Sequence, residues 1–281
     1  MNKTGQIITL TTDWSNNGYL SRDADAPDVN PIGDQYIAQM KSILFRVSPS
    51  VFVIDISHKV AAFNAIQAAY LLKSVYPLLP EGTIHFVGVN SEPSPRNKPV
   101  FIMKDGHYFV GANDGMFSMV FSGEPDYAGE IEPDDNLAGF AALKVFAVVV
   151  KHLTEGKDPT KIGTPCSMKR DIVSGAAYDE NGITGAVVFI DSYGNIITNI
   201  SREMFEKVGR GRAFKICIHD SKTYIDRLSS YYDDVPEQFL LAMFNSSGML
   251  ELALRNGNMA KLENMNTRSV IRVGFDGSRL F

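Results

Sequence analysis

A short polar segment, IDSYGNIITNI at residues 190–200, carries three side chains that could together hold a small charged ligand. The apolar run before it predicts a strand that ends at Asp191, and Gly194 suits the sharp turn that follows. The carboxylate of Asp191 can bind an ammonium, the amide of Asn195 can pair with a purine edge, and the ring of Tyr193 can stack on a flat base. The alternative is an ordinary hairpin with polar turn residues.

Further polar side chains are predicted where strands end in the first half of the chain. Asp13, Asp55 and Asn90 each lie at the end of an apolar run that predicts a buried strand. Between these runs, helices are predicted at 35–46 and from a capping Asn64 onward. Alternating strands and helices predict a largely parallel sheet with covering helices. Ligands bind such sheets at the carboxyl ends of the strands, so we expect a binding edge there.

The pattern of predicted elements changes in the middle of the chain. Residues 138–154 predict a long buried helix, and a polar segment punctuated by Pro and Gly follows at 157–171. Short strands and turns come next, with one short helix after Ser201. We therefore predict an α/β domain at residues 1–165 and an all-β, barrel-like domain at residues 172–281.

Composition excludes several classes of protein and partner. The 281 residues are 44% hydrophobic and 21% charged, which is ordinary for a soluble globular protein. A formal charge of -5 argues against a nucleic-acid partner, and no apolar run approaches the length of a membrane span. Cys166 and Cys217 lie far apart, which favours a reducing cytoplasm. His58 is expected to be a structural hydrogen-bonding residue, and no paired His or Cys predicts a metal site.

Six dispersed segments give the chain a resemblance to one family. It resembles the S-adenosylmethionine (SAM) hydrolases, also called SAM hydroxide adenosyltransferases, and their halogenating relatives, the fluorinases and chlorinases. The segments follow the family's order: ITLTTDW (8–14), GDQYIAQMKSIL (33–44), VIDISH (53–58), ANDGMFS (112–118), IDSYGNIITNI (190–200) and NSSGMLELALRNGNMAKL (245–262). The resemblance implies SAM as substrate or ligand with no separate cofactor. It also implies a homotrimer whose pockets lie between the first domain of one subunit and the second domain of its neighbour.

The resemblance assigns polar contacts to SAM. Asp13 would accept hydrogen bonds from the ribose hydroxyls, and such charge-assisted bonds are the stronger kind. Asp34 and Asp191 would hold the substrate ammonium. Ser246 would contact the amino-acid end, and Ser247 stands where fluorinases carry an arginine for the carboxylate.

The resemblance also assigns contacts to the nucleoside. Phe63 would lie against it, and Tyr232 would stack on the adenine, with Tyr231 as an alternative register. Asn195 and the backbone near Asn256 would pair with the adenine edge.

One segment departs from the family in length. Residues 15–32, SNNGYLSRDADAPDVNPI, form a polar insertion where relatives have a short turn. Long loops in compact domains are often functional. We therefore predict that the insertion covers the pocket as a lid.

The residues expected to activate water depart from the family as well. Hydrolases use an Asp and an Arg from a D-P-G-V-G-T-x-R loop and a His from an H-G-R-D turn. Here Asn90 stands at the Asp, Arg96 or, in another register, Lys98 at the Arg, and Ala141 at the His. Neither Asn90 nor Ala141 can take a proton at neutral pH.

Two functions remain open. The first is an enzyme that displaces methionine from C5′ of SAM by water, hydroxide or halide, with Arg96 orienting the nucleophile. Its leaving group is a neutral thioether, so catalysis would rest on in-line alignment and on removing water from the nucleophile. The second is a catalytically inactive protein that binds SAM or adenosine as a sensor or sequestering protein. The nucleoside-binding residues are present, so binding is better supported than turnover.

Overall fold

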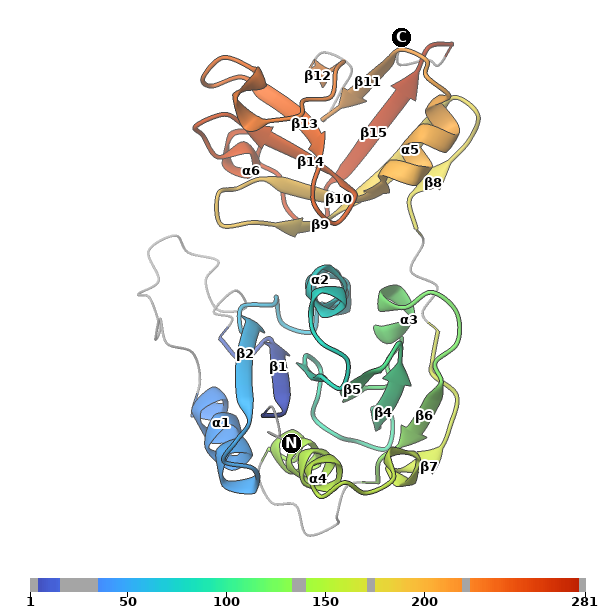
Figure 1. The fold of residues 1–281 in the computed structure, drawn as a ribbon. Coiled ribbons are helices and arrows are strands. Elements are labelled where there is room, and N and C mark those ends of the chain that lie inside the picture. The colour runs from blue at the N-terminus through green and yellow to red at the C-terminus, as the bar shows by residue number, and fades with distance from the viewer. Residues whose placement is uncertain (1–4, 16–34, 133–139, 171–174, 219–222, 278–281) are drawn as a thin grey trace. The chain divides into compact units, whose positions relative to one another are not determined.

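The computed structural model describes residues 5–15, 35–132, 140–170, 175–218 and 223–277 (Figure 1). The chain divides into two compact units, Met1–Ile172 and Val173–Phe281. The N-terminal unit contains β1 (Ile7–Thr12), α1 (Gln35–Val47), β2 (Phe52–Ser57), α2 (Ala65–Val75), β3 (Ile84–Gly88), β4 (Pro99–Lys104), β5 (His107–Ala112), α3 (Phe117–Val120), β6 (Tyr127–Glu130), α4 (Ala142–Thr154) and β7 (Thr164–Pro165). The C-terminal unit contains β8 (Ala177–Tyr178), β9 (Gly182–Ile190), β10 (Ile196–Ser201), α5 (Arg202–Gly209), β11 (Phe214–Cys217), β12 (Tyr224–Ile225), β13 (Leu240–Phe244), β14 (Met249–Leu254), α6 (Met259–Leu262) and β15 (Val270–Phe275).

A mixed sheet with the strand order β2-β1-β3-β5-β4-β6-β7 forms the N-terminal unit. Pairing is parallel from β2 to β5 and antiparallel at β4, β6 and β7. The sheet is thus less parallel than the alternation of elements predicts. The reason is local: Asp105 and Gly106, both with positive φ, make a two-residue turn that folds β5 back on β4 as a hairpin.

Two pairs of helices cover this sheet, α1 with α4 and α2 with α3 (Figure 1). Helix α1 buries Ile37, Met40 and Leu44, which lie on one face at helical spacing. Successive strand residues point to opposite faces of a sheet. Accordingly, Phe86 packs in the core beneath α1 and α4, whereas Val87 packs in the core beneath α2 and α3. None of the helices in the described ranges is long and apolar enough to cross a membrane.

The C-terminal unit is an antiparallel sheet in the order β12-β11-β15-β9-β10-β14-β13, with β8 paired to β9. Its two end strands approach each other, because Ser229 after β12 donates its backbone N–H to the carbonyl of Ala242 in β13 at 2.7 Å. The sheet is therefore nearly closed and encloses one apolar core. The predicted fold class, an α/β unit followed by an all-β, barrel-like unit, is confirmed.

Candidate functional site

Asp13 lies directly after β1, at the edge where the parallel strands have their carboxyl ends. Its Oδ2 accepts the backbone N–H of Phe63 at 3.0 Å, and the backbone N–H of Asn90 also bonds to the carboxylate. The loops after β2 and β3 thus both hold this side chain. Burial raises the pKa of Asp13 above its ordinary value, and these backbone bonds partly oppose the rise.

The two residues that donate to Asp13 have unusual backbone conformations. Phe63 has a φ of 61° and Asn90 a φ of 49°, both in the left-handed region that non-glycine residues rarely adopt. Phe63 is nonetheless 66% exposed. A strained residue that presents an aromatic ring to solvent is typical of a ligand-binding position.

The loop after β3 contains the residues predicted to act on the nucleophile. The side-chain amide of Asn90 donates to Asp114 at 3.3 Å, and Asn97 donates to the carbonyls of Asn90 and Glu92 at 2.5 and 3.1 Å. Oε1 of Glu92 accepts the backbone N–H of Ala141 at 3.4 Å, next to the start of α4. Glu92 therefore places a carboxylate beside Ala141, the residue predicted to stand at the family's His, and the sequence analysis did not select Glu92.

The two alternatives for the loop cation differ in their surroundings. Nζ of Lys98 lies 2.5 Å from Glu130 and 3.0 Å from Glu132, so its charge is balanced by two carboxylates. Arg96 is exposed on the same loop, and its backbone N–H donates to Ser94. The geometry favours Arg96 as the residue available to a ligand. Asp34 and residues 16–32 of the predicted lid lie outside the described residues.

A pocket of about 790 Å³ lies in the C-terminal unit at the end of β14. Its size suits a ligand as large as a nucleoside. The pocket is lined by Asp191, Tyr193, Asn195, Tyr232, Asp233, Leu254, Arg255, Asn256, Gly257 and Asn258. Five of these residues, from three separate segments, are the predicted Asp191, Tyr193, Asn195, Tyr232 and Asn256. The structure thus brings Tyr232 and Asn256 to the same pocket as the three residues selected on the 190–200 segment.

Hydrogen bonds order the wall formed by the β9–β10 turn. Oδ1 of Asp191 accepts the backbone N–H groups of Tyr193 and Asn195 at 2.9 and 2.8 Å, and Oδ2 accepts the side-chain amide of Asn195 at 3.0 Å. The side-chain amide oxygen of Asn195 takes no part in these three hydrogen bonds. The hydroxyl of Tyr232 donates to the buried Glu251 at 2.6 Å, which fixes that ring. Tyr232, not Tyr231, lines the pocket.

Two predicted serines lie apart from this pocket, and two residues that were not predicted line it. Ser246 and Ser247 lie in the turn between β13 and β14, and neither is among the residues that line this pocket. Arg255 and Asn258 do line it, although the sequence analysis did not select them. The sequence signal that could have identified Arg255 and Asn258 is their position directly beside Asn256 and Gly257.

Gly194 is required by the packing of the pocket wall. Its φ is +83°, and a Cβ atom there would lie 2.2 Å from the side chain of Asn258, which caps α6. We expect Gly194→Ala to lower the free energy of unfolding by about 1–3 kcal/mol, because strain and overpacking act together. Gly248→Ala is the matched control, since Gly248 has a φ of +71° but open space around the Cβ position. Equal losses in urea unfolding of both variants would show that the Asn258 contact has no part.

Comparisons with known proteins show which family the chain is similar to. A family model described as the SAM hydroxide adenosyltransferase N-terminal domain matches residues 31–163, and the C-terminal domain of the same name matches residues 185–272. The (R)-S-adenosyl-L-methionine hydrolase of Thermus thermophilus is 27% identical over 241 residues, covering 80% of this chain and 89% of that protein. The hydrolase of the same name from Methanocaldococcus jannaschii is 26% identical over 285 residues, covering 95% of each chain.

A halogenating enzyme and a solved structure are also similar. A fluorinase from Nocardia brasiliensis is 24% identical over 281 residues, covering 86% of this chain and 93% of that protein. The crystal structure of an uncharacterized conserved protein from Thermotoga maritima has a TM-score of 0.79 at 22% identity, covering 96% of this chain and 100% of that chain. That likeness concerns the fold alone.

Proposed function

This chain belongs to the SAM hydroxide adenosyltransferase family, and from that premise we propose that it converts SAM and water into adenosine and methionine. A halide in place of water would give a 5′-haloadenosine. The observation that carries the proposal is the pocket in which Asp191, Tyr193, Asn195, Tyr232 and Asn256 meet. Carboxylate, amide and aromatic groups there match the ammonium and adenine of SAM in chemistry. SAM is the substrate, and no separate cofactor is proposed.

The proposed reaction is an in-line displacement at C5′. The water oxygen forms a bond to C5′, the bond from C5′ to sulfur breaks, methionine leaves as a neutral thioether, and one proton passes to solvent. Asp13 would hold the ribose hydroxyls, while Asn90 and Arg96 would orient the attacking oxygen. We further propose a cytoplasmic homotrimer, with residues 1–165 of one subunit and 172–281 of its neighbour forming each site. Asp34, Ser246 and Ser247 would then contact the amino-acid end.

The main alternative is a protein that binds SAM or adenosine without turning it over. The observation that favours it is that Asn90 and Ala141 offer no group able to take a proton from water. Incubation of the purified protein with SAM, with and without chloride, separates the two. Equal release of adenosine and methionine supports the enzyme, and 5′-chloroadenosine would identify halide as nucleophile. Calorimetric binding without product selects the alternative, and no binding at millimolar SAM rejects both.

Phe63 provides a test of the nucleoside site that separates binding from stability. Glycine adopts a φ of 61° without strain, so Phe63→Gly should leave the free energy of unfolding within about 1 kcal/mol of the parent value. Loss of the ring should lower adenosine affinity about tenfold, since stacking and burial are both lost. Phe63→Ala keeps the strain without the ring and serves as control. Parent-like adenosine affinity in both variants would place the ring outside the site.

A further inference from the structure

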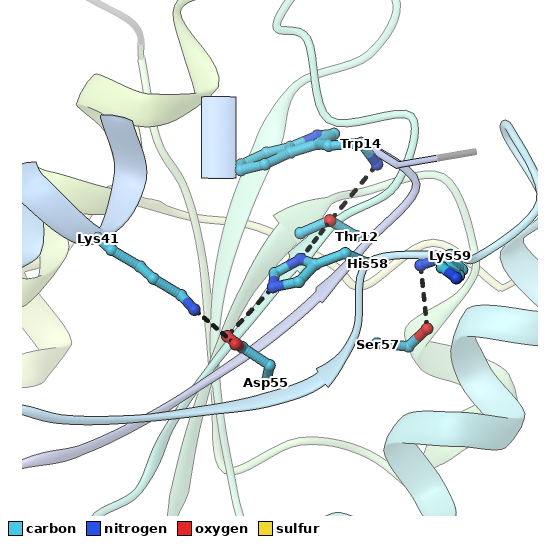
Figure 2. Close-up of polar contacts among 7 residues, drawn as sticks. All are labelled: Thr12, Trp14, Lys41, Asp55, Ser57, His58 and Lys59. Atoms are coloured by element: carbon cyan, nitrogen blue, oxygen red, sulfur yellow. Dashed lines mark hydrogen bonds and ion pairs between the residues drawn. The ribbon is translucent and has the colours of Figure 1, made fainter. Parts of the chain in front are cut away.

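A chain of polar contacts runs through His58 beside the Asp13 loop (Figure 2). The backbone N–H of Trp14 donates to Oγ1 of Thr12 at 3.4 Å, and that oxygen lies 2.9 Å from Nδ1 of His58. On the other side of the ring, Nε2 of His58 lies 3.1 Å from Oδ1 of Asp55. Oδ2 of Asp55 accepts a hydrogen bond from Lys41 of α1 at 2.5 Å. The chain therefore links α1, β2 and the segment after β1.

The chemistry of the end groups sets the direction of this chain. Lys41 can only donate and the Asp55 carboxylate only accepts, so a hydrogen on Nε2 of His58 is the one that Asp55 stabilises. Within the described part of the chain Nε2 has no well-directed hydrogen bond, so its contact with Asp55 is electrostatic. Nδ1 then accepts from the Thr12 hydroxyl, whose oxygen accepts from Trp14. When His58 is neutral, the Thr12 hydroxyl, Nδ1 of His58 and the Trp14 N–H are thus all hydrogen-bonded, and the hydrogen on Nε2 faces the Asp55 carboxylate.

Protonation of His58 would break this match. Both ring nitrogens would carry hydrogen, so the Thr12 hydroxyl would face two donors, His58 and the Trp14 backbone. Thr12 is completely buried, and its own hydrogen would lose its acceptor there. The charged groups that face the ring are Asp55, from β2, and Lys41, from α1. Burial, the larger effect, lowers the pKa of His58, and Lys41 lowers it further, while Asp55 opposes both.

The segment that His58 holds is also the segment that carries Asp13. The carbonyl of His58 accepts the N–H of Ser15 at 2.9 Å, and the N–H of Val60 donates to the carbonyl of Thr12 at 3.2 Å. The same loop, 58–63, ends at Phe63, whose N–H bonds to the Asp13 carboxylate. Residues 12–15 and 58–63 are thus tied together on both sides of Asp13, and His58 supplies the side-chain part of that connection.

We infer that His58 is a positioning residue: in its neutral form it holds Asp13 and Phe63 in the geometry that binds the nucleoside, and its protonation weakens that binding. The inference rests on the proposed function of Asp13. Because the pKa of His58 is lowered from 6.5, the neutral form prevails at neutral pH. Ligand affinity should therefore be greatest at neutral pH and fall as the pH drops below 6.5 through the pKa of His58.

Calorimetry with adenosine from pH 5 to 8 tests the inference. We expect His58→Ala to bind about tenfold more weakly than the parent at pH 7.5, because the Thr12 hydroxyl loses its acceptor. His58→Asn can keep an acceptor for that hydroxyl without titrating, so it should recover most of the affinity at pH 7.5 and lose the decline below pH 6.5. Ser57→Ala is the control, since Ser57 bonds only to the nearby Lys59 backbone among the contacts drawn (Figure 2).

Lys41→Met provides a variant on an accessible side chain that leaves His58 in place. Removing this positive charge should raise the pKa of His58, visible in the NMR titration of its ring protons, and move the decline in affinity to higher pH. Parent-like affinity in His58→Ala, or the same pH profile in the parent and His58→Asn, would overturn the inference while leaving the proposed function intact. Failure of the parent to bind adenosine or SAM at any pH would overturn both.

Discussion

Replacing Asp13 with alanine is expected to weaken adenosine and SAM binding by about 1.5–3 kcal/mol, or roughly 10- to 150-fold. The reason is that charge-assisted hydrogen bonds to the ribose hydroxyls would be lost from a carboxylate that Phe63 and Asn90 already hold in place. Calorimetry at pH 7.5 measures the effect. Asp126→Ala is a suitable control, because Asp126 is an exposed carboxylate of the same unit outside the site. A loss below a few tenths of a kcal/mol would show that the ribose is held elsewhere.

The same carboxylate gives the binding reaction a second pH dependence. Burial raises the pKa of Asp13 above 3.8, so its charge is lost at a higher pH than for an exposed aspartate. Ribose binding that needs the ionised form should weaken as the pH falls toward this range. Asp13→Asn should bind weakly throughout and lose this dependence. The His58→Asn variant should keep it, which separates the two titrations.

His85 is expected to make the N-terminal unit sensitive to acid. The ring is completely buried, with Nδ1 2.8 Å from Oγ1 of Thr9 and Nε2 3.1 Å from Nδ1 of His107. Burial, with a smaller contribution from His107, lowers the pKa of His85 to about 3. Burial also lowers the pKa of His107, against the opposing charges of Glu81 and Asp105.

The sign of the effect follows from linkage. The unfolded chain takes up a proton at His85 near pH 6.5, whereas the folded protein resists protonation until about pH 3. The stability that neutral His85 contributes is therefore present above pH 6.5 and is lost as the pH falls toward 3. The free energy of unfolding should fall by up to about 1.4 kcal/mol per pH unit in this window from His85 alone, a few kcal/mol in total.

Urea unfolding between pH 7.5 and 4.5 measures this slope. Trp14, the one tryptophan of the sequence, is buried in the N-terminal unit and reports its unfolding by fluorescence. His85→Gln should flatten the slope, even if the variant is less stable at every pH. Thr9→Val removes the hydrogen bond to Nδ1 but keeps the imidazole, so its slope should remain. Identical slopes in the parent and His85→Gln would show that another group controls the acid sensitivity.

Much of the fold could be predicted because the relevant signals are local. Helix and strand periods follow from residues a few positions apart, and the caps at Asn64 and Ser201 form within one turn of their helices. The same holds for part of the candidate site. Asp191, Tyr193 and Asn195 occupy one turn, and their mutual hydrogen bonds span at most four residues. A reading of the sequence could therefore select them together.

Contacts between distant residues could be decided only by the tertiary structure. Asp13 and Phe63 are 50 residues apart, Glu92 and Ala141 are 49 apart, and Lys98 pairs with Glu130 across 32 residues. These contacts are set by the order of the strands in the sheet. The strand order in turn depends on how the whole sheet packs between its helices. The residue types that could bind a nucleoside could therefore be identified from the sequence alone. Their hydrogen-bond partners depend on long-range packing, which the local periodicity of the sequence does not specify. The same holds for the ion pairs of Lys98 with Glu130 and Glu132.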